Sequence, residues 1–319
     1  MLAYMAQRGQ VRSLVPVPVP GAVARQRGAA RFLLDLCVIA RPWFWPVSLL
    51  PLYVGFVLAS HRLWPTVGQL PRLLVAALVV EPLVWLAVLA VNDANDLPGD
   101  LRNPRKAGGP LTSGRLTPRA VRQIAFAAAG AALVVGLWVG AVFAAGALLS
   151  LVLGWLYSVP PVRLKARPGA DVAVNALALG ALGPLAGWTA IHPLAGFPWP
   201  ISLQGVLVGA ALYVPTTLAD HAADLASGYR TVAVRLGPRR AYLLGFAAWT
   251  GAAALSVVLA ATGTVIPRRM LPFEVVTVPG LILAYHLLLR RHRSIARIAA
   301  VSVLFLIPSG IFALMYTRT

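Results

Sequence analysis

Residues 73–100 read LLVAALVVEPLVWLAVLAVNDANDLPGD, an apolar run that ends in a cluster of acidic side chains. A helix of about 20 apolar residues is long enough to cross the roughly 30 Å of hydrocarbon in a bilayer. The stretch therefore predicts a transmembrane helix over about 73–92, with the carboxylates that follow it close to one membrane surface.

Apolar runs of this kind recur along the whole chain. Of its 319 residues, 59% are hydrophobic and 12% are charged, whereas a soluble domain carries about 25% charged residues. We expect an all-α integral membrane protein of about nine transmembrane helices, in a single domain over 41–319 that follows a flexible, basic cytoplasmic arm over 1–40. The predicted spans lie near 42–60, 73–92, 119–137, 139–157, 171–191, 201–219, 240–261, 272–289 and 297–316.

The net charge of +19 is typical of a nucleic-acid-binding protein, but the basic residues here lie between apolar spans. Five of the 28 Lys and Arg residues lie beyond the odd-numbered spans, and the other 23 lie in the arm and the loops after even-numbered spans. Cytoplasmic loops of membrane proteins are enriched in Lys and Arg. We therefore expect the lipid bilayer and no nucleic acid as partner, a cytoplasmic N-terminus, and a C-terminus on the opposite side. The five residues are Arg62, Arg72, Arg268, Arg269 and Arg318.

Gly and Pro lie inside several spans, most densely at Gly180, Gly183, Pro184 and Gly187. Small residues let membrane helices approach one another closely, and this is the interpretation that we favour. The alternative is that the fifth span bends to shape a cavity.

Five of the nine acidic residues fall in two short clusters. The first cluster, at 92–100 (NDANDLPGD), ends the second span, and the second, at 220–224 (DHAAD), ends the sixth span. By the charge distribution, both lie on the cytoplasmic side. Pro98 and Gly99 are expected to end the helix before Asp100, so that this carboxylate comes from the following turn.

The spacing within the clusters indicates metal binding. Asp96 and Asp100 are four residues apart, as are Asp220 and Asp224, and on a helix this places both carboxylates of a pair on one face. Like charges repel there, whereas Mg²⁺ prefers oxygen ligands and combines one or two carboxylates with phosphate oxygens and water. Two clusters that face each other could hold magnesium ions around one diphosphate.

Two other interpretations compete with the metal hypothesis. Solvated acids at helix ends would explain one cluster, but two clusters in a chain so poor in acids favour a function. A proton or cation pathway would need acids buried at mid-span. Few acids lie there, among them Glu81 and Asp171 within or at the edge of a span, and Asp35 precedes the first, so a transporter is the weaker hypothesis.

Basic residues accompany both clusters. Arg102 and Lys106 follow the first, Arg230 follows the second, and Lys165 ends the distinctive loop YSVPPVRLK at 157–165. Because Arg and Lys can neutralise a diphosphate as it leaves, these four are candidate diphosphate contacts. The other basic residues of these loops are interpreted as topology signals.

Together these residues resemble the UbiA superfamily of intramembrane prenyltransferases. Residues 92–100 match its first motif, N-D-x-x-D-x-x-x-D, at every defined position, and 220–237 resemble its second motif with the tail that follows it. Three flanking stretches also match, namely RPW at 41–43, GPLTSGR at 109–115 and YSVPPVRLK at 157–165. The likeness extends from about residue 40 to residue 240, in the expected order.

The resemblance implies a bundle of nine helices around a central cavity that is capped on the cytoplasmic side. It implies Mg²⁺ as cofactor and an isoprenyl diphosphate as substrate, with Lys165 and Arg230 in contact with the diphosphate. Members commonly carry Asp-Arg after the second pair, but here Leu225 follows, which leaves one cationic contact in doubt. The implied metal ligands are Asn92, Asp96 and Asp100 for the first site and Asp220 and Asp224 for the second. The four aspartates are the implied catalytic residues, and Asn92 is also expected to contact the diphosphate.

The fate of the prenyl group stays open at this point. The prenyl cation must be captured in a dry pocket, either by a hydrophobic acceptor, aromatic or of another lipid pathway, or by its own chain as in a terpene cyclase. A polar acceptor-binding cluster would favour transfer. We expect a prenyltransferase, with a cyclase as the alternative and a membrane transporter as the second alternative. Candidates for a polar acceptor cluster are Asn175, Thr189, Thr216 and Thr217.

Overall fold

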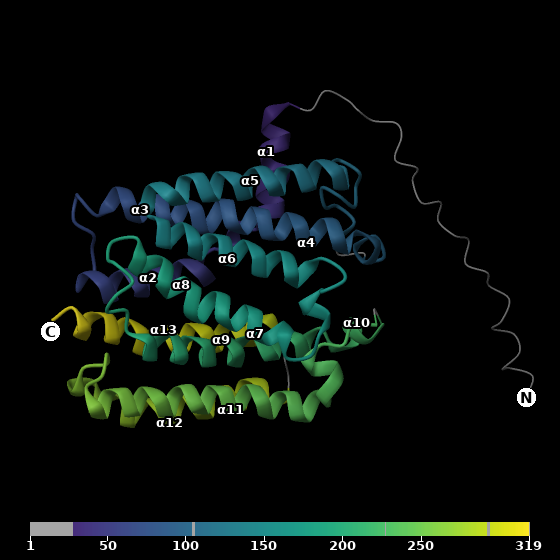
Figure 1. The fold of residues 1–319 in the computed structure, drawn as a ribbon. Helices are drawn as coiled ribbons and strands as arrows, with labels where there is room; N and C mark the ends of the chain where they lie inside the picture. The colour runs from purple at the N-terminus through teal and green to yellow at the C-terminus, as the bar shows by residue number, and fades with distance from the viewer. Residues whose placement is uncertain (1–27, 104–105, 227, 292–293, 319) are drawn as a thin grey trace, which may run out of the picture.

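The computed structural model of the chain describes residues 28–103, 106–226, 228–291 and 294–318, and every regular element in these ranges is a helix (Figure 1). Short 3₁₀ or π-helical stretches are labelled η. In chain order the elements are α1 (Ala29–Ala40), η1 (Pro42–Phe44), α2 (Pro46–Ser60), α3 (Leu70–Leu78), η2 (Val79–Val84), α4 (Trp85–Asp100), α5 (Pro118–Val139), α6 (Ala141–Ser158), η4 (Leu164–Ala166), α7 (Ala170–Leu177), η5 (Ala178–Leu182), α8 (Gly183–Thr189), α9 (Trp199–Ala219), α10 (His221–Ala226), α11 (Val232–Thr262), η6 (Arg268–Met270), α12 (Leu271–Leu289) and α13 (Ile295–Tyr316).

The helices confirm an all-α integral membrane protein. Within the described ranges, eight helical stretches are long and apolar enough to cross a membrane, and a ninth results if α1 and α2 count as one span across a bend of 59°. The bend falls at Pro42 and Pro46, whose rings remove backbone donors from the helix. The second predicted span is the unbroken Leu70–Asp100, and the fifth is Ala170–Thr189.

The segment that the sequence assigns to a flexible arm divides near residue 28. Residues 1–27 lie outside the described residues, whereas α1 is a helix that packs against α4. Asp35 of α1 is buried, and its Oδ1 lies 2.9 Å from Nε and 2.9 Å from Nη2 of Arg115. Helical order therefore begins well before the predicted boundary at residue 40, because an ion pair between distant residues holds α1 to the bundle.

Glycines allow the closest helix contacts in the bundle. A Cβ atom added to Gly187 of α8 would lie 1.8 Å from the carbonyl oxygen of Leu52 in α2, and one added to Gly180 of η5 would lie 2.2 Å from the carbonyl carbon of Gly205 in α9. Neither position has room for a side chain, so the backbones of the two helices in each pair pack directly against each other. This geometry supports the close-packing interpretation of the glycine-rich fifth span.

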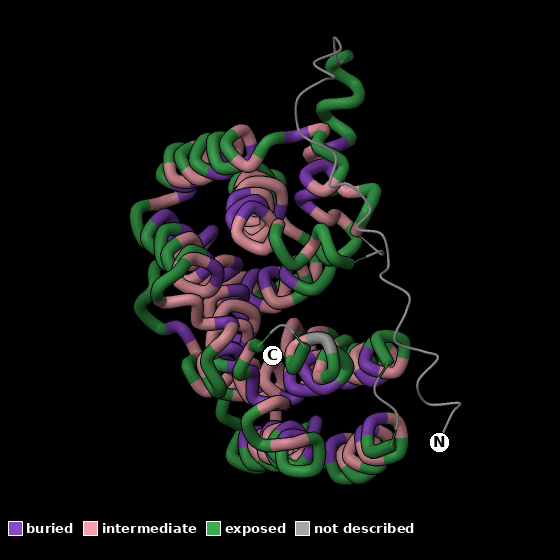
Figure 2. The backbone as a smooth tube through the Cα atoms, turned by 90° about the vertical axis from the view of Figure 1, so that its right-hand side faces the viewer, coloured by how far each residue is buried: buried purple, intermediate pink, exposed green. Residues whose placement is uncertain are grey.

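Both acidic clusters reach the same end of the bundle, on the right in Figure 1. This end carries the last turns of α4, α6 and α9, the first turns of α7 and α11, and α10. Figure 2, turned by 90°, shows many of the helices nearly end on, with exposed residues outside and buried residues mostly inside. Helix α11 bends at Gly237, whose φ of 75° is left-handed, so that its first turn lies at an angle to the rest.

Candidate active site

The last turns of α4 carry the first acidic cluster. Asn92, Asp96 and Asp100 recur every four residues of one helix, which places them along one face. The prediction that Pro98 and Gly99 end the helix before Asp100 is wrong, because α4 continues to Asp100. Pro98 lies in the final turn, where its missing N–H removes only one intrahelical hydrogen bond.

Lys165 binds the first cluster directly. Its Nζ lies 2.7 Å from Oδ1 of Asn92 and 2.7 Å from each carboxylate oxygen of Asp96. Lys165 is only 8% exposed, and burial lowers the pKa of its ammonium group while Asp96 opposes the shift. Three oxygens thus surround one cation, which is the donor set that a hard metal ion also takes.

Arg163 connects the two acidic regions. Its Nη2 donates to Oδ1 of Asp96 at 2.9 Å and to the hydroxyl of Tyr229 at 2.7 Å, and its guanidinium lies over the Tyr229 ring, 5.0 Å from the centroid. Tyr229 belongs to the segment between α10 and α11, directly after the second cluster. Neither residue was predicted from the sequence to belong to the site, and Arg163 was interpreted as a topology signal. The loop motif around Lys165 could have indicated Arg163, whereas no sequence pattern marks Tyr229.

The other predicted cations differ in their contacts. Nζ of Lys106 lies 2.7 Å from Oδ1 of Asp100, so this residue joins the first cluster. Arg102 and Arg230 are exposed, and within the described ranges the structure places neither in contact with a candidate carboxylate. Their assignment to the diphosphate stays a prediction.

The second cluster lies at the junction of α9 and α10. The backbone N–H of Asp224 donates to the carbonyl of Asp220 at 2.9 Å, so one helical turn separates the two. Asp220 is exposed. Asp224 is half-buried, and its Oδ2 accepts a hydrogen bond from Oγ1 of Thr231 at 3.1 Å. Burial raises the pKa of the Asp224 carboxyl group, and the Thr231 hydrogen bond partly opposes this.

Asp171 fixes the position of the segment that carries Tyr229. Its carboxylate is fully buried and accepts hydrogen bonds from the backbone N–H groups of Gly169 and Val232, each at 2.9 Å. The first turn of α7 is thereby tied to the first turn of α11. With both oxygens bonded to backbone, Asp171 is a structural tether, which argues against a proton pathway at this position.

Two adjacent hydroxyl-bearing residues at the end of α6, Tyr157 and Ser158, make polar contacts near the first cluster. Ser158 donates to Oδ1 of Asn92 at 3.3 Å, and the hydroxyl of the adjacent Tyr157 lies 2.6 Å from the hydroxyl of Tyr213 in α9. Asn175, a candidate for acceptor binding, donates to the backbone carbonyl of Asp171 at 2.9 Å. Polar groups thus reach beyond the carboxylates.

The candidate threonines do not form a polar acceptor cluster. The hydroxyl of Thr189 donates to the carbonyl of Leu185, and those of Thr216 and Thr217 donate to carbonyls one turn back in α9. Each hydroxyl uses its single hydrogen-bond donor within its own helix and keeps only acceptor lone pairs for a ligand.

The donor set is suited to a metal that binds together with its substrate. Among the described residues, no three His, Cys, Asp or Glu side chains lie close enough to share one ion. Mg²⁺ characteristically takes one or two carboxylates and completes its shell with phosphate oxygens and water. The oxygens gathered around Lys165 meet that requirement.

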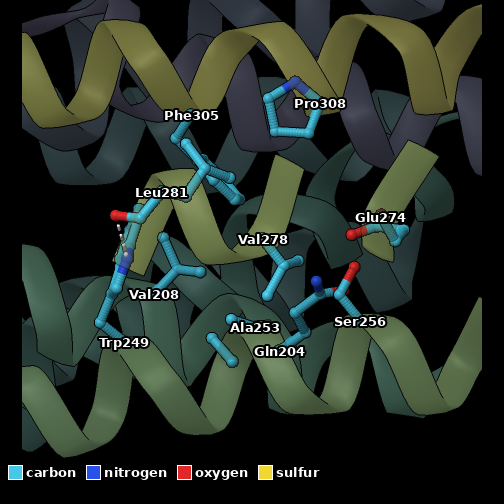
Figure 3. Close-up of a pocket in the computed structure, with 11 residues that line it drawn as sticks. Gln204, Val208, Trp249, Ala253, Ser256, Glu274, Val278, Leu281, Phe305 and Pro308 are labelled. Carbon is cyan, nitrogen blue, oxygen red and sulfur yellow. Dashed lines mark hydrogen bonds between the residues drawn. The ribbon is translucent and has the colours of Figure 1, made fainter. Parts of the chain in front are cut away.

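A separate pocket lies between α9, α11, α12 and α13, away from the clusters (Figure 3). Apolar side chains such as Trp249 and Phe305 line it, and Gln204, Ser256 and Glu274 add polar groups. It contains none of the candidate site residues.

A model of the UbiA prenyltransferase family matches residues 48–308. The chain belongs to this family. The predicted resemblance is thereby confirmed, and the chain is a multi-pass intramembrane prenyltransferase by family. Among curated relatives of this UbiA-family protein, the lycopene elongase/hydratase of Haloferax volcanii is 32% identical over 225 residues, which are 69% of this chain and 71% of the relative. That of Halobacterium salinarum is 29% identical over 228 residues, 69% and 78% of the two chains.

Solved structures share the fold of this UbiA-family protein. A UbiA homologue from Archaeoglobus fulgidus bound to GPP and Mg²⁺ superposes with a TM-score of 0.71 at 19% identity, covering 89% of this chain and all of the other. A digeranylgeranylglyceryl phosphate synthase superposes with a TM-score of 0.69 at 17% identity, covering 90% of this chain and 98% of the other.

Proposed function

We propose that this UbiA-family protein transfers the prenyl group of an isoprenyl diphosphate to a carbon–carbon double bond of an apolar polyene acceptor, with Mg²⁺ as cofactor. The observation that carries the proposal is the pairing of Asp96 with both Lys165 and Arg163 at 2.7–2.9 Å. The proposed acidic metal ligands and the cations that would stabilise the leaving diphosphate therefore lie in direct contact. The acceptor class is supported by the relatives named lycopene elongase/hydratase.

Bound Mg²⁺ would neutralise the diphosphate and stabilise it as a leaving group. The residues that would hold Mg²⁺ all carry side-chain oxygens, and all lie at the same end of the bundle. The fit rests on the cradle of Asn92 and Asp96 oxygens, which already surrounds the Lys165 ammonium. The proposed ligands are Asn92, Asp96, Asp100, Asp220 and Asp224.

Arg163 and Lys165 are the proposed partners of the leaving diphosphate. Nε of Arg163 is buried and has no hydrogen-bond partner within the described part of the chain. A buried donor without a partner is rare in proteins, and a phosphate oxygen would satisfy it with a charge-assisted bond. As the bond between C1 and oxygen breaks, these two cations stabilise the negative charge that develops on the diphosphate.

The surroundings of the site favour an apolar acceptor. Thr189, Thr216 and Thr217 each donate their hydroxyl hydrogen to their own helix, so none has a free donor for the oxygen of a phenol or a sugar. Tyr157 precedes Ser158, whose hydroxyl bonds Asn92, and the hydroxyl of Tyr157 contacts that of Tyr213. Aromatic faces stabilise a cation nearby. An alkene acceptor carries no polar group to be recognised. After its new carbon–carbon bond forms, the positive charge left on the acceptor is discharged by loss of a proton or by addition of water.

The test is a product assay in membranes that contain the protein. Mg²⁺ is supplied with dimethylallyl, geranyl, farnesyl or geranylgeranyl diphosphate, and each donor is combined with lycopene, with 4-hydroxybenzoate or with no acceptor. Extracts are analysed by mass spectrometry. We expect prenylated lycopene, lost in Asp96→Ala and Asp224→Ala and lost on addition of EDTA.

Each other outcome has a definite meaning. Prenylated 4-hydroxybenzoate without a lycopene product would assign an aromatic acceptor and overturn the polyene proposal. A cyclic terpene formed without acceptor would make the protein a cyclase. Turnover that survives EDTA and both aspartate variants would refute the metal hypothesis itself.

We also propose that the N-terminus and the site face the cytoplasm. The proposal rests on the 23 basic residues on that side of the chain against five on the other. Reporter fusions after Arg318 and within the loop at 102–117 test it, and a cytoplasmic signal from the C-terminal fusion would overturn it.

A further inference from the structure

Three arginines gather at the end of the bundle opposite the acidic clusters. Helix α11 begins beside Asp171 and ends at Thr262, so the turn after it lies at the far end. A shallow surface pocket that is widely open to solvent lies there. It is lined by Thr262, Gly263, Pro267, Arg268, Arg269 and Arg318.

Two of these arginines are held in place by backbone carbonyls. Nη2 of Arg268 donates to the carbonyl of Thr262 at 3.3 Å, and its side chain packs against Gly263, where an added Cβ would lie 3.0 Å from Cγ of Arg268. Nη2 of Arg269 donates to the carbonyl of Met315 at the end of α13. Each guanidinium uses one nitrogen in this way and keeps further N–H groups for a ligand.

These three arginines carry positive charge that no carboxylate in the described ranges balances. Among the described residues, none of the three arginines forms an ion pair with a carboxylate. The acid that follows them most closely in the chain, Glu274, is buried in the separate pocket between α9, α11, α12 and α13 (Figure 3). The positive-inside pattern disfavours Arg on this side, yet three of the five basic residues found there line one pocket.

The adjoining surface of α12 is apolar and faces outward. Only 11% of the most apolar window of the span Arg268–Leu289 is buried, the smallest share among the eight spans. The exposed large hydrophobic side chains on α12 are Val275, Val276, Leu283 and Leu287. Hydrocarbon chains can therefore lie along this helix directly below the arginines.

We infer that Arg268, Arg269 and Arg318 bind the phosphate of an anionic membrane phospholipid whose acyl chains lie along α12. Guanidinium groups recognise phosphate oxygens through paired N–H donors. A free phosphate offers the same oxygens, but the adjacent apolar helix face favours a ligand that carries hydrocarbon. The site is distinct from the prenyl diphosphate site and does not depend on the proposed function.

The experiment uses the full chain, purified in detergent and incubated with phosphatidylglycerol or with phosphatidylcholine of the same acyl composition. Native mass spectrometry counts the lipids retained. We expect retention of phosphatidylglycerol to fall about a hundredfold in the triple variant Arg268→Gln, Arg269→Gln, Arg318→Gln, because each arginine near an anionic headgroup contributes roughly fivefold. Retention of phosphatidylcholine should not change.

A matched control removes the same charge from the other end of the bundle. Arg119→Gln, Arg239→Gln, Arg240→Gln replaces three exposed arginines of α5 and α11 near the acidic clusters, and this variant should retain phosphatidylglycerol as the unchanged protein does. Equal loss in both triple variants would show a general charge effect and overturn the inference. So would displacement of the lipid by millimolar inorganic phosphate, which would assign a free anion as the ligand.

Discussion

Nη2 of Arg163 lies 2.9 Å from Oδ1 of Asp96 and, with the same nitrogen, donates to Tyr229. One side chain thereby joins the acidic cluster of α4 to the segment that follows the second cluster. Asp171, at the start of α7, ties the same segment to the helix that follows the loop at 159–169. The two candidate metal regions are therefore joined by Arg163 within this loop and by Asp171 just after it.

Arg163→Ala should lower kcat/KM by about 10²–10³, the usual cost of removing one group that stabilises developing charge. Arg167→Ala is the matched control. It removes the same charge from the same loop, but Arg167 is exposed and, among the residues that the structure describes, donates only to the carbonyl of Pro161 at 3.2 Å. Kinetics with the acceptor that supports turnover measure both. Equal effects of the two variants would contradict a specific role for Arg163.

Lys165→Met should reduce activity far more than Lys106→Met. Lys165 contacts three oxygens of the first cluster and its side chain is 9% exposed, whereas Lys106 pairs with Asp100 and is 41% exposed. An exposed ion pair contributes about 1 kcal/mol or less. The comparison uses kcat/KM and the Mg²⁺ concentration for half-maximal rate, and an equal or larger loss in Lys106→Met would show that burial does not select the important lysine.

Asp224→Asn should raise the Tm of the metal-free protein while abolishing turnover. Burial raises the pKa of Asp224, so the folded protein binds the proton more tightly than the unfolded chain does. That stabilisation is complete below the unfolded pKa and is lost as the pH rises through the folded pKa. At neutral pH the ionised group therefore destabilises the fold, and an amide removes this cost.

Thermal unfolding in EDTA across a pH series measures the effect of Asp224→Asn. The difference in Tm from the unchanged protein should shrink as the pH falls and Asp224 becomes protonated. Asp220→Asn, at an exposed position, should change the Tm little. A lower Tm for Asp224→Asn at neutral pH would mean that the ionised carboxylate stabilises the fold.

Gly187→Ala should destabilise the bundle by about 1–3 kcal/mol, the usual cost of overpacking. The added Cβ would lie 1.8 Å from the carbonyl oxygen of Leu52, so α2 and α8 must move apart. Gly130→Ala in α5 meets no atom within 4 Å and should cost nothing, because Ala is the better helix former. Unfolding in a denaturing detergent compares the two, and equal stability of the variants would contradict direct backbone packing.

The membrane spans were predictable because each depends on a local property. About 20 apolar residues cross a bilayer whatever their neighbours are, so the predicted span 201–219 coincides with α9. The four-residue spacing of Asp96 and Asp100 likewise needs only the helix period. The effect of Pro98 was mispredicted, because its cost depends on how much helix follows it.

The sequence was sufficient to predict an integral membrane protein, because its composition is too apolar for a soluble domain. It also contained the two acidic clusters at helix ends and the motifs that resemble the UbiA superfamily. Tertiary structure alone decided which cations meet which acids. Arg163 and Lys165 reach Asp96 across more than 60 positions of the chain, Arg115 holds Asp35, and Arg102 and Arg230 face outward. The reason is physical: apolarity and helix period are properties of neighbouring residues, whereas an ion pair depends on where a folded loop returns, which no local pattern encodes.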